Sequence, residues 1–278
     1  NSYLTGMFYS SATFENIEIT ASGLSAVFAA KYDANGNFQW VQKANSQQAA
    51  RPYSIAIDNS GNSYITGYFI DTTIFGTIQL TPWANEEIFI AKYDANGNLQ
   101  WAKKAGGNGY DIGQGISTDN LGNCYVTGEF TSLATFGNIQ LSNNNFYVED
   151  IFIAKYDPNG NIVWVRKAGG SSYDEGNDIA TDGAGNSYVT GPFRGTATFG
   201  NTQISSGGSS DIFIAKYDAN GNLLWVRKAG GTGEDSGNDI TIDNSGNCYM
   251  TGTFRSTATF GTTQIISTGA EDIFTAKY

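Results

Sequence analysis

Short apolar segments separated by turns of Gly, Asn and Asp recur along the whole chain. Four of them are Asn177–Asp182, Asn186–Phe193, Asp211–Asp218 and Asn222–Ala229, and we name these strand types a, b, c and d. They are rich in Ile, Val, Tyr, Phe and Trp, as β-strands are. The c segment is apolar on both of its alternating faces, which is typical of a strand that is covered on both sides. No stretch of the sequence has a helical period of useful length, so the pattern predicts an all-β fold.

The four-segment pattern repeats about every 61 residues. The Tyr of the motif AKY stands at Tyr32, Tyr93, Tyr156, Tyr217 and Tyr278, and the Thr of Y-x-T-G stands at Thr5, Thr66, Thr127, Thr190 and Thr251. Each marker keeps a spacing of 61 residues except for one spacing of 63, so two extra residues lie near the stretch SNNNFYVED. Four strands in a unit of this length indicate a β-propeller blade, whereas tandem immunoglobulin-like domains need about 100 residues each. We therefore predict a single β-propeller domain over residues 1–278.

The number of copies of each segment predicts how many blades the chain contains and which strands are missing. The repeat units are approximately 1–54, 55–115, 116–178, 179–239 and 240–278, which we call repeats 1 to 5. Segments b and c occur five times and segments a and d four times, so five blades are represented and one d-plus-a segment is missing. The chain opens in mid-pattern, which we interpret as a fragment of a longer precursor. Neighbouring sequence or another chain would then complete the ring, and a five-bladed ring would close by pairing strands from its two ends.

Composition narrows the range of functions. The net charge is -11, from 26 acidic and 15 basic residues, and a field of this sign repels nucleic acid and anionic lipid. No apolar run approaches the ~20 residues of a membrane-spanning helix, so membrane insertion is not expected. The chain contains no His, which is the commonest general base and metal ligand.

The two cysteines occupy equivalent positions in two repeats that are not adjacent. Cys124 and Cys248 stand where other repeats have Ser63 and Ser187. A disulfide would have to join strands of separate repeats, so we expect two free, buried thiols.

The repeat resembles a known family. The run DIFIAKYDANGNLLWVRKAGG from Asp211, followed by GEDSGNDITIDNSGNCYMTGTF from Gly233, is similar to the bacterial beta-propeller repeat family abbreviated SBBP. This resemblance covers essentially the whole chain. It implies a propeller on a secreted or cell-surface protein, frequent in Bacteroidota and often beside a type IX secretion signal. It implies no particular reaction.

The turn sequence DANGN between segments c and d has two interpretations. A calcium loop of the EF-hand type spaces several acids over about twelve residues and ends with Glu, but DANGN has one acid and Gly in fourth place. The copy DPNGN, with Pro158 second, fits a type I turn followed by a left-handed Gly in a bulge. The a–b connections, such as DNSGN from Asp58, have the same chemistry. We predict structural turns, with no metal and no other cofactor.

Residues present in every repeat are expected to serve the scaffold. They include the Lys of AKY, at Lys31, Lys92, Lys155, Lys216 and Lys277, and the d-segment Trp, at Trp40, Trp101, Trp164 and Trp225. We predict an ion pair or hydrogen bond between blades for the Lys and packing for the Trp.

The long d–a and b–c connections are predicted to share one side of the domain, opposite the short turns, and to carry function. The d–a loops have an acid in register at Asp111, Asp174 and Asp235. The b–c loops diverge most, and their candidate binding residues are Trp83, Phe146, Tyr147, Arg194 and Arg255. Exposed aromatic and Arg side chains suit a saccharide or protein partner, but the aromatics could equally cap the outer edge of a blade.

Two classes of function compete. The first is a non-catalytic binding or scaffold module of an extracellular or cell-surface bacterial protein, with a protein or carbohydrate partner. The second is a carboxylate-dependent, glycan-degrading enzyme acting in the central channel, for which Glu129 is a candidate because no other repeat has an acid there. No two candidate acids clearly converge, so the sequence favours a protein that is not an enzyme. A passive structural spacer is a further alternative.

Overall fold

The computed structural model describes residues 1–143 and 146–278, and every regular element within these residues is a β-strand. Asn144 and Asn145, in the stretch that carries the predicted insertion, lie outside the described residues. None of the described residues forms a helix long and apolar enough to cross a membrane.

The strands follow the order of the predicted segments, with additional pairs between b and c. Repeat 1 contains β1 (Ser2–Phe8), β2 (Ser11–Phe14), β3 (Ile17–Thr20), β4 (Ser25–Tyr32) and β5 (Phe38–Ser46). Repeat 2 contains β6 (Ala50–Ile57), β7 (Ser63–Phe69), β8 (Thr73–Phe75), β9 (Ile78–Leu80), β10 (Glu87–Tyr93) and β11 (Leu99–Gly107). Repeat 3 contains β12 (Asp111–Thr118), β13 (Cys124–Phe130), β14 (Leu133–Phe136), β15 (Ile139–Ser142), β16 (Asp150–Tyr156) and β17 (Ile162–Gly170). Repeat 4 contains β18 (Asp178–Thr181), β19 (Ser187–Phe193), β20 (Thr196–Phe199), β21 (Thr202–Ser205), β22 (Asp211–Tyr217) and β23 (Leu223–Gly231). Repeat 5 contains β24 (Ser236–Ile242), β25 (Cys248–Phe254), β26 (Thr257–Phe260), β27 (Thr263–Ile266) and β28 (Asp272–Lys277).

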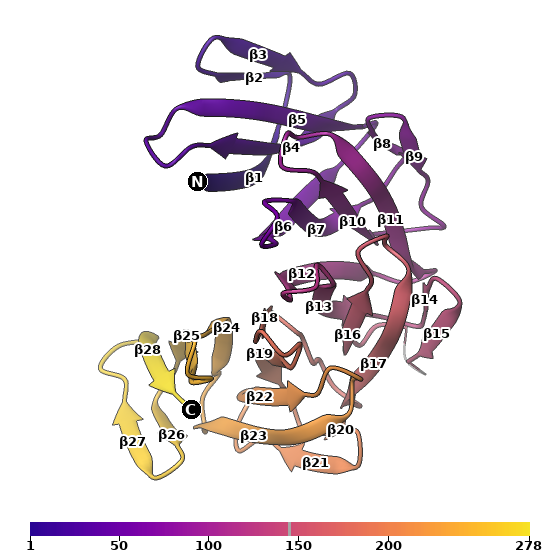
Figure 1. Ribbon diagram of the computed structural model, residues 1–278. Helices are drawn as coiled ribbons and strands as arrows, with labels where there is room; N and C mark the ends of the chain where they lie inside the picture. Colours follow the sequence, from indigo (N-terminus) through magenta and orange to yellow (C-terminus); the bar gives the residue numbers. More distant parts are fainter. Residues whose placement is uncertain (144–145) are drawn as a thin grey trace.

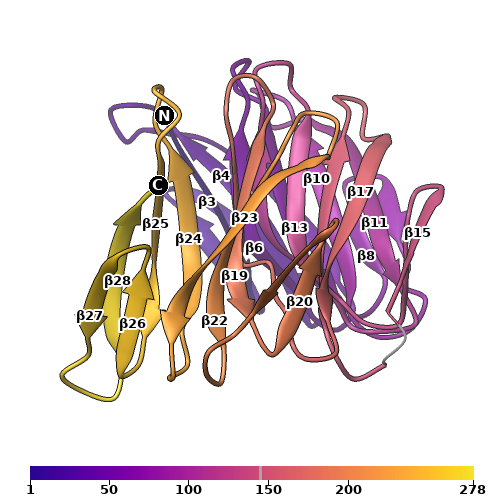
Figure 2. The same cartoon turned by 90° about the horizontal axis from the view of Figure 1, so that it is seen from below.

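Segments a, b, c and d of one repeat form an antiparallel sheet in that order, as predicted for a blade. In repeat 4 the order is β18-β19-β22-β23. The sheets stand side by side in an arc, with the a strands β6, β12, β18 and β24 on its inner side (Figure 1). The strands run between two sides of the array, one with the short turns and one with the long connections (Figure 2).

The b–c connections are not the open loops that we predicted, because each contains a β-hairpin. In repeat 4 this hairpin is β20–β21, and β20 pairs with β17 of the preceding repeat through Ala168↔Phe199 and Gly170↔Ala197. Each hairpin from β8–β9 to β26–β27 thus extends the sheet of the repeat before it. Among the described residues, only the ends of these connections lie outside strands.

The core lies between neighbouring sheets, so each c strand of repeats 2 to 4 contributes to two cores. Phe152 of β16 packs with Ile88 and Ile90 of repeat 2. Its neighbours Ile151 and Ile153 pack with Val189 of repeat 4. The predicted double burial of segment c is confirmed. The thiols of Cys124 and Cys248 are buried and free, as expected.

The five repeats do not form a closed ring. The sheet of repeat 1 begins at β1 and the sheet of repeat 5 ends at β28, and these two strands do not pair with each other in the described part of the chain. They lie at opposite ends of the arc, with an opening between the two termini (Figure 1). Closure as a five-bladed ring is therefore not confirmed.

Candidate functional site

The side of the array with the short turns is uniform, and its turns have the predicted bulged form. In the turn that begins at Asp94, the carboxylate Oδ1 accepts the N–H groups of Asn96 and Asn98, each at 2.9 Å. Oδ2 accepts the Asn98 side-chain N–H at 2.8 Å, and Gly97 has a φ of 86°. Hydrogen bonds from Asn98, with those from the turn amides, lower the pKa of Asp94. Protein donors thus occupy the carboxylate, which makes this turn a structural element.

These turns also join consecutive repeats. The carbonyl of Pro158 accepts hydrogen bonds from Lys92 Nζ at 3.2 Å and from Trp101 Nε1 at 3.1 Å, both from the preceding repeat. Ala95 and Ala219 accept the same pair of bonds in their own turns. The predicted hydrogen bond between blades is confirmed for Lys31, Lys92 and Lys155. Trp40, Trp101 and Trp164 contribute a hydrogen bond as well as packing.

The repeated acids of the d–a loops are buried, and their carboxylates accept hydrogen bonds from the main chain of these loops. Asp174 is fully buried, and its carboxylate accepts the N–H groups of Gly170 at 2.8 Å and Arg194 at 3.0 Å. Asp235 accepts those of Gly231 and Arg255 in the same way. Burial raises the pKa of Asp174 to about 7 and the pKa of Asp111 to about 8, and it also raises that of Asp235. Asp174 and Asp235 thus fix the main-chain positions of the candidate residues Arg194 and Arg255.

Arg194 and Arg255 line one cleft of about 250 Å³ on the long-loop side, between repeats 4 and 5. Arg255 forms ion pairs with Glu234 at 2.7 Å and Glu271 at 3.7 Å. The Arg194 guanidinium lies 5.9 Å from the ring centre of Tyr173, and one of its N–H groups points to the Ser209 hydroxyl at 3.4 Å. Among the described residues, no carboxylate forms an ion pair with Arg194. Arg194 is therefore the cation of the cleft that a ligand can engage.

The other three candidate binding residues lie elsewhere. Lys104 Nζ is 3.6 Å from the ring centre of Trp83 and also pairs with the buried Glu87 at 3.3 Å. The main-chain N–H of Trp83 donates to Glu87, so Trp83 covers an ion pair while remaining 54% exposed. Phe146 and Tyr147 are both exposed and contact each other edge to face, with 5.4 Å between ring centres. The structure thus brings two of the five candidates into one cleft.

Glu129 is a buried acid in an acidic neighbourhood. It is 6% exposed, its Oε1 accepts a hydrogen bond from Gln114 at 3.1 Å, and its Oε2 has no partner among the described residues. Burial raises the pKa of Glu129 well above its usual value, and the charges of Glu175, Glu149 and Glu86 add to this effect. Burial and the neighbouring acids thus favour the neutral form of the Glu129 carboxyl group.

Two features of this side were missed from the sequence. Tyr173, Glu175 and Glu234 line the cleft beside the repeated acids of the d–a loops, at positions whose residue changes from repeat to repeat, and Glu271 lines it from the end of the last b–c connection. In repeat 2, Tyr53 and Tyr68 have ring centres 6.0 Å apart, and a hydrogen bond with Tyr53 raises the pKa of Arg51. The sequence signal for this second feature is the first d–a loop, NSQQAARPYS, which has Ala50 where the other repeats have an Asp.

The d, a and b segments of successive repeats match a known family model. The model is SBBP, a beta-propeller repeat, and it matches residues 39–68, 100–129, 163–191 and 224–253. These four stretches are beta-propeller repeats. Each runs from a d strand into the b strand of the next repeat, for example from β11 to β13.

Two curated proteins are similar to the chain. The uncharacterized WD repeat-containing protein L264 of Acanthamoeba polyphaga mimivirus is 29% identical over 264 residues, which cover 77% of this chain and 19% of that protein. The regulatory protein FlaEY of Caulobacter vibrioides is 26% identical over 165 residues, which cover 57% of this chain and 17% of that protein. The chain thus spans less than a fifth of the length of either relative.

Proposed function

We propose that this beta-propeller repeat protein is a non-catalytic binding module whose ligand, a carbohydrate, docks in the cleft between repeats 4 and 5. The observation that carries the proposal is the Arg194 guanidinium beside the Tyr173 ring, in a cleft shaped by two repeats. Aromatic rings stack on sugar faces, and charged planar side chains hydrogen-bond to hydroxyl groups.

The charges of the cleft indicate which ligands it favours. Glu175, Glu234, Asp235 and Glu271 outnumber the two Arg residues, so an anionic ligand would be repelled. A neutral, hydroxyl-rich ligand can use both the carboxylates and the guanidinium groups. A protein partner is the alternative, for which exposed Tyr and Arg side chains are equally suited.

The setting of the module is a second part of the proposal. The resemblance to bacterial beta-propeller repeats supports a secreted or cell-surface protein. The four matched repeats and the open arc support a propeller ring with more than five blades, because five blades leave an opening (Figure 1).

Arg194→Thr tests the binding proposal. Thr is chosen as the replacement because repeat 3 has Thr131 at the equivalent position. A glycan array probed with the chain should give hits that the variant loses by tenfold or more. Arg166→Thr removes a cation from the turn side and should leave the hits unchanged. Array hits that bind both variants equally would refute the cleft, whereas a protein pulled down from surface extract in an Arg194-dependent way would support the protein alternative.

Glu129 favours a second candidate function, the carboxylate-dependent glycan-degrading enzyme. Burial and the charge of Glu175 raise the pKa of Glu129, and a carboxyl group with a raised pKa suits the general acid of glycosidic bond cleavage. This alternative predicts that Glu129→Gln abolishes polysaccharide depolymerisation without weakening binding. If the array, the pull-down and the depolymerisation assay all give nothing, the protein is a passive spacer.

A further inference from the structure

The cleft between repeats 4 and 5 has an acidic counterpart one repeat earlier. Three uncharged residues line the cleft at positions that recur in the repeat, namely Pro192, Ser210 and Ser236. At the equivalent positions between repeats 3 and 4 the chain has Glu129, Glu149 and Glu175, and we name these three residues the acid site. Glu175 also lines the cleft, so the acid site and the cleft adjoin each other.

The three acids come from main-chain segments that touch one another. The first N–H of residues 174–176 donates to the Glu149 carbonyl at 3.1 Å. A Cβ added to Gly176 would lie 3.2 Å from the carbonyl oxygen of Gly128, the residue before Glu129. Residues 174–176, which carry Glu175, therefore pack against the main chain beside both other acids.

The acid site occurs at one junction of the array. Between repeats 2 and 3 the same positions have Tyr68, Glu86 and Ile112. A set of residues that every junction needed would be repeated, as the Lys and Trp of the turn side are. The acid site is therefore not explained by the common scaffold.

Glu129 lacks the partners that other buried acids of the array have. The buried acids that begin c strands each pair with a Lys, as Glu87 does with Lys104, and the repeated acids of the d–a loops accept main-chain N–H groups. Among the described residues, no acid-site carboxylate forms an ion pair. Glu129 is 6% exposed, and its Oε2 and that of Glu149 are buried with no hydrogen-bond partner within the same residues. Such oxygens are costly to bury, so the acid site lacks a positively charged donor.

An ammonium group suits this site better than a metal ion does. Among the described residues, no group of three acid or thiol side chains is arranged to hold a metal ion. An ammonium group is a compact charge with three N–H donors, and it does not need the close cage of ligands that a metal ion needs. Burial and the charges of Glu175 and Glu149 raise the pKa of Glu129, and a bound cation opposes that repulsion.

An exposed ring accompanies the acid site, as one does the cleft. Tyr173 lines the cleft, and Tyr110 is its equivalent one repeat earlier. The two side chains are 48% and 45% exposed. The main-chain N–H of Tyr110 donates to the Thr131 hydroxyl at 2.7 Å, which holds Tyr110 two residues from Glu129 along β13. Each of the two sites thus combines an aromatic ring with charged groups, as sugar-binding surfaces do.

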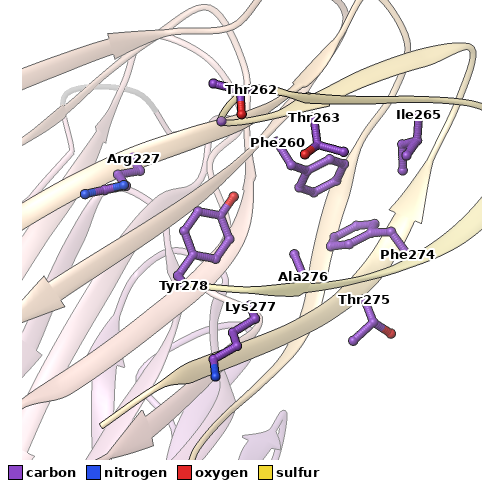
Figure 3. Close-up of a pocket in the computed structure, with 11 residues that line it drawn as sticks. Arg227, Phe260, Thr262, Thr263, Ile265, Phe274, Thr275, Ala276, Lys277 and Tyr278 are labelled. Carbon is purple, nitrogen blue, oxygen red and sulfur yellow. The ribbon is translucent and has the colours of Figure 1, made fainter.

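The cavity beside β28 has the opposite charge. Its volume is about 440 Å³, and the facing rings of Phe260 and Phe274 line it together with Arg227 and Lys277 (Figure 3). None of the described residues that line it is acidic. A cationic ligand therefore has no partner there and is drawn to the acid site instead.

We propose that the acid site is a subsite for the ammonium group of an amino sugar, so that the ligand of the cleft is an oligosaccharide with free amino groups. This inference rests on the carbohydrate proposal and adds to it the class of sugar. The neutral parts of the ligand lie in the cleft beside Tyr173 and Arg194. Its ammonium group donates to the acid-site carboxylates, and close charge pairs of this kind contribute specificity.

Two oligosaccharides that differ only in charge test the inference. One is a short oligomer of β-1,4-linked glucosamine and the other is its N-acetylated form. Calorimetry with the full chain should show that the amino form binds about tenfold or more tightly, because acetylation removes the charge that the acid site pairs with. Equal affinities, or tighter binding of the N-acetylated oligomer, would overturn the inference.

Variants of the chain locate the effect. Glu129→Gln keeps the size of the side chain and removes its charge, so it should remove the preference for the amino oligomer and leave binding of the N-acetylated oligomer unchanged. Glu149→Gln should act in the same direction. Glu18→Gln removes an exposed acid of β3 in repeat 1 and should change neither affinity. If Glu18→Gln weakens binding as much as Glu129→Gln does, the net charge of the chain and not the acid site attracts the ligand, and the inference is wrong.

Stability and a third probe separate the remaining outcomes. Glu129→Gln breaks no ion pair and should keep its urea midpoint, so lost binding would not reflect unfolding. Arg194→Thr should weaken both oligomers alike. Arg194-dependent binding without preference for the amino form would leave the carbohydrate proposal standing and overturn this inference. Glu129-dependent binding of a lysine-rich peptide, with no binding of either oligomer, would contradict both.

Discussion

The turn side and the long-loop side of the array differ in how far they vary from one repeat to the next. On the turn side, Lys92 and Lys155 make the same bond to the following turn, and the acids of these turns make the same set of hydrogen bonds. On the long-loop side, the position of Arg194 is held by Ile70, Thr131 and Arg255 in other repeats. A residue needed at every junction is repeated, whereas a residue that binds one ligand has no reason to be. The comparison separates the scaffold from the candidate site.

The largest effect should come from a turn-side Trp at an internal junction. Trp164 is buried and donates to Ala219, so Trp164→Ala should lower the free energy of unfolding by about 3–5 kcal/mol. Trp225→Ala is the matched variant, and it should cost less because, among the described residues, Trp225 is only half-buried. Urea denaturation measures both. Equal losses of unfolding free energy would mean that these Trp residues stabilise the protein through packing within their own repeat, and not through contact with the following repeat.

Turn glycines should give the next largest effect. Gly97 has a φ of 86°, and a Cβ there would lie 2.8 Å from the Trp40 ring. Gly36 has a φ of 83° but no atom within 4 Å of the added Cβ among the described residues. Gly36→Ala should therefore cost about 1–2 kcal/mol for the left-handed backbone alone, and Gly97→Ala should cost more.

Thermal unfolding of the two Gly variants distinguishes strain in the turn from contact between repeats. A Gly36→Ala midpoint as low as that of Gly97→Ala would show that the contact with the preceding repeat contributes nothing.

A smaller effect should appear in the dependence of stability on pH. Burial raises the pKa of Asp174 to about 7 and that of Asp111 to about 8, so the folded chain holds protons that the unfolded chain loses near pH 4. The free energy of unfolding should consequently fall as the pH rises from about 4 to 8. Asp243 acts in the opposite direction below this window, because hydrogen bonds from Asn247 lower its pKa to about 2. Stability is thus lost again as the pH falls from about 4 to 2.

Asp174→Asn tests the predicted fall in stability between about pH 4 and 8. The variant should be less stable at pH 5, since an amide nitrogen cannot accept one of the two main-chain N–H bonds. Its stability should decline less steeply between pH 5 and 7 than that of the parent chain in urea titrations. An unchanged slope would mean that Asp174 ionises normally in the folded state.

The sequence predicted those parts of the molecule that follow a local pattern. The strand β22 could be placed from its doubly apolar run, and the Pro158 copy identified the turn type. The hairpin β20–β21 was missed because a four-residue strand at a sheet edge has few apolar positions, and its partner β17 belongs to another repeat. The recurring T-A-T-F-G motif was the signal that could have revealed it.

The candidate site was predicted only in part, because it forms between repeats. Arg194 and Arg255 stood out as residues that the other repeats lack, but their common cleft depends on how two neighbouring sheets pack. The acids Glu234 and Glu271 carry no sequence signal for their ion pairs with Arg255. Trp83 is exposed and stays a predicted binding residue, but its contact with Lys104, which pairs with Glu87, could not be predicted from the sequence.

The division between scaffold side and binding side is tested most directly by measuring binding and stability together for Arg194→Thr and Trp164→Ala. Affinity for a glycan-array hit and the urea midpoint are recorded for both variants. Arg194→Thr should lose affinity by tenfold or more and keep its midpoint, whereas Trp164→Ala should lose about 3–5 kcal/mol of unfolding free energy. If Arg194→Thr lowers the midpoint and leaves the affinity unchanged, the long-loop side belongs to the scaffold and the account is contradicted.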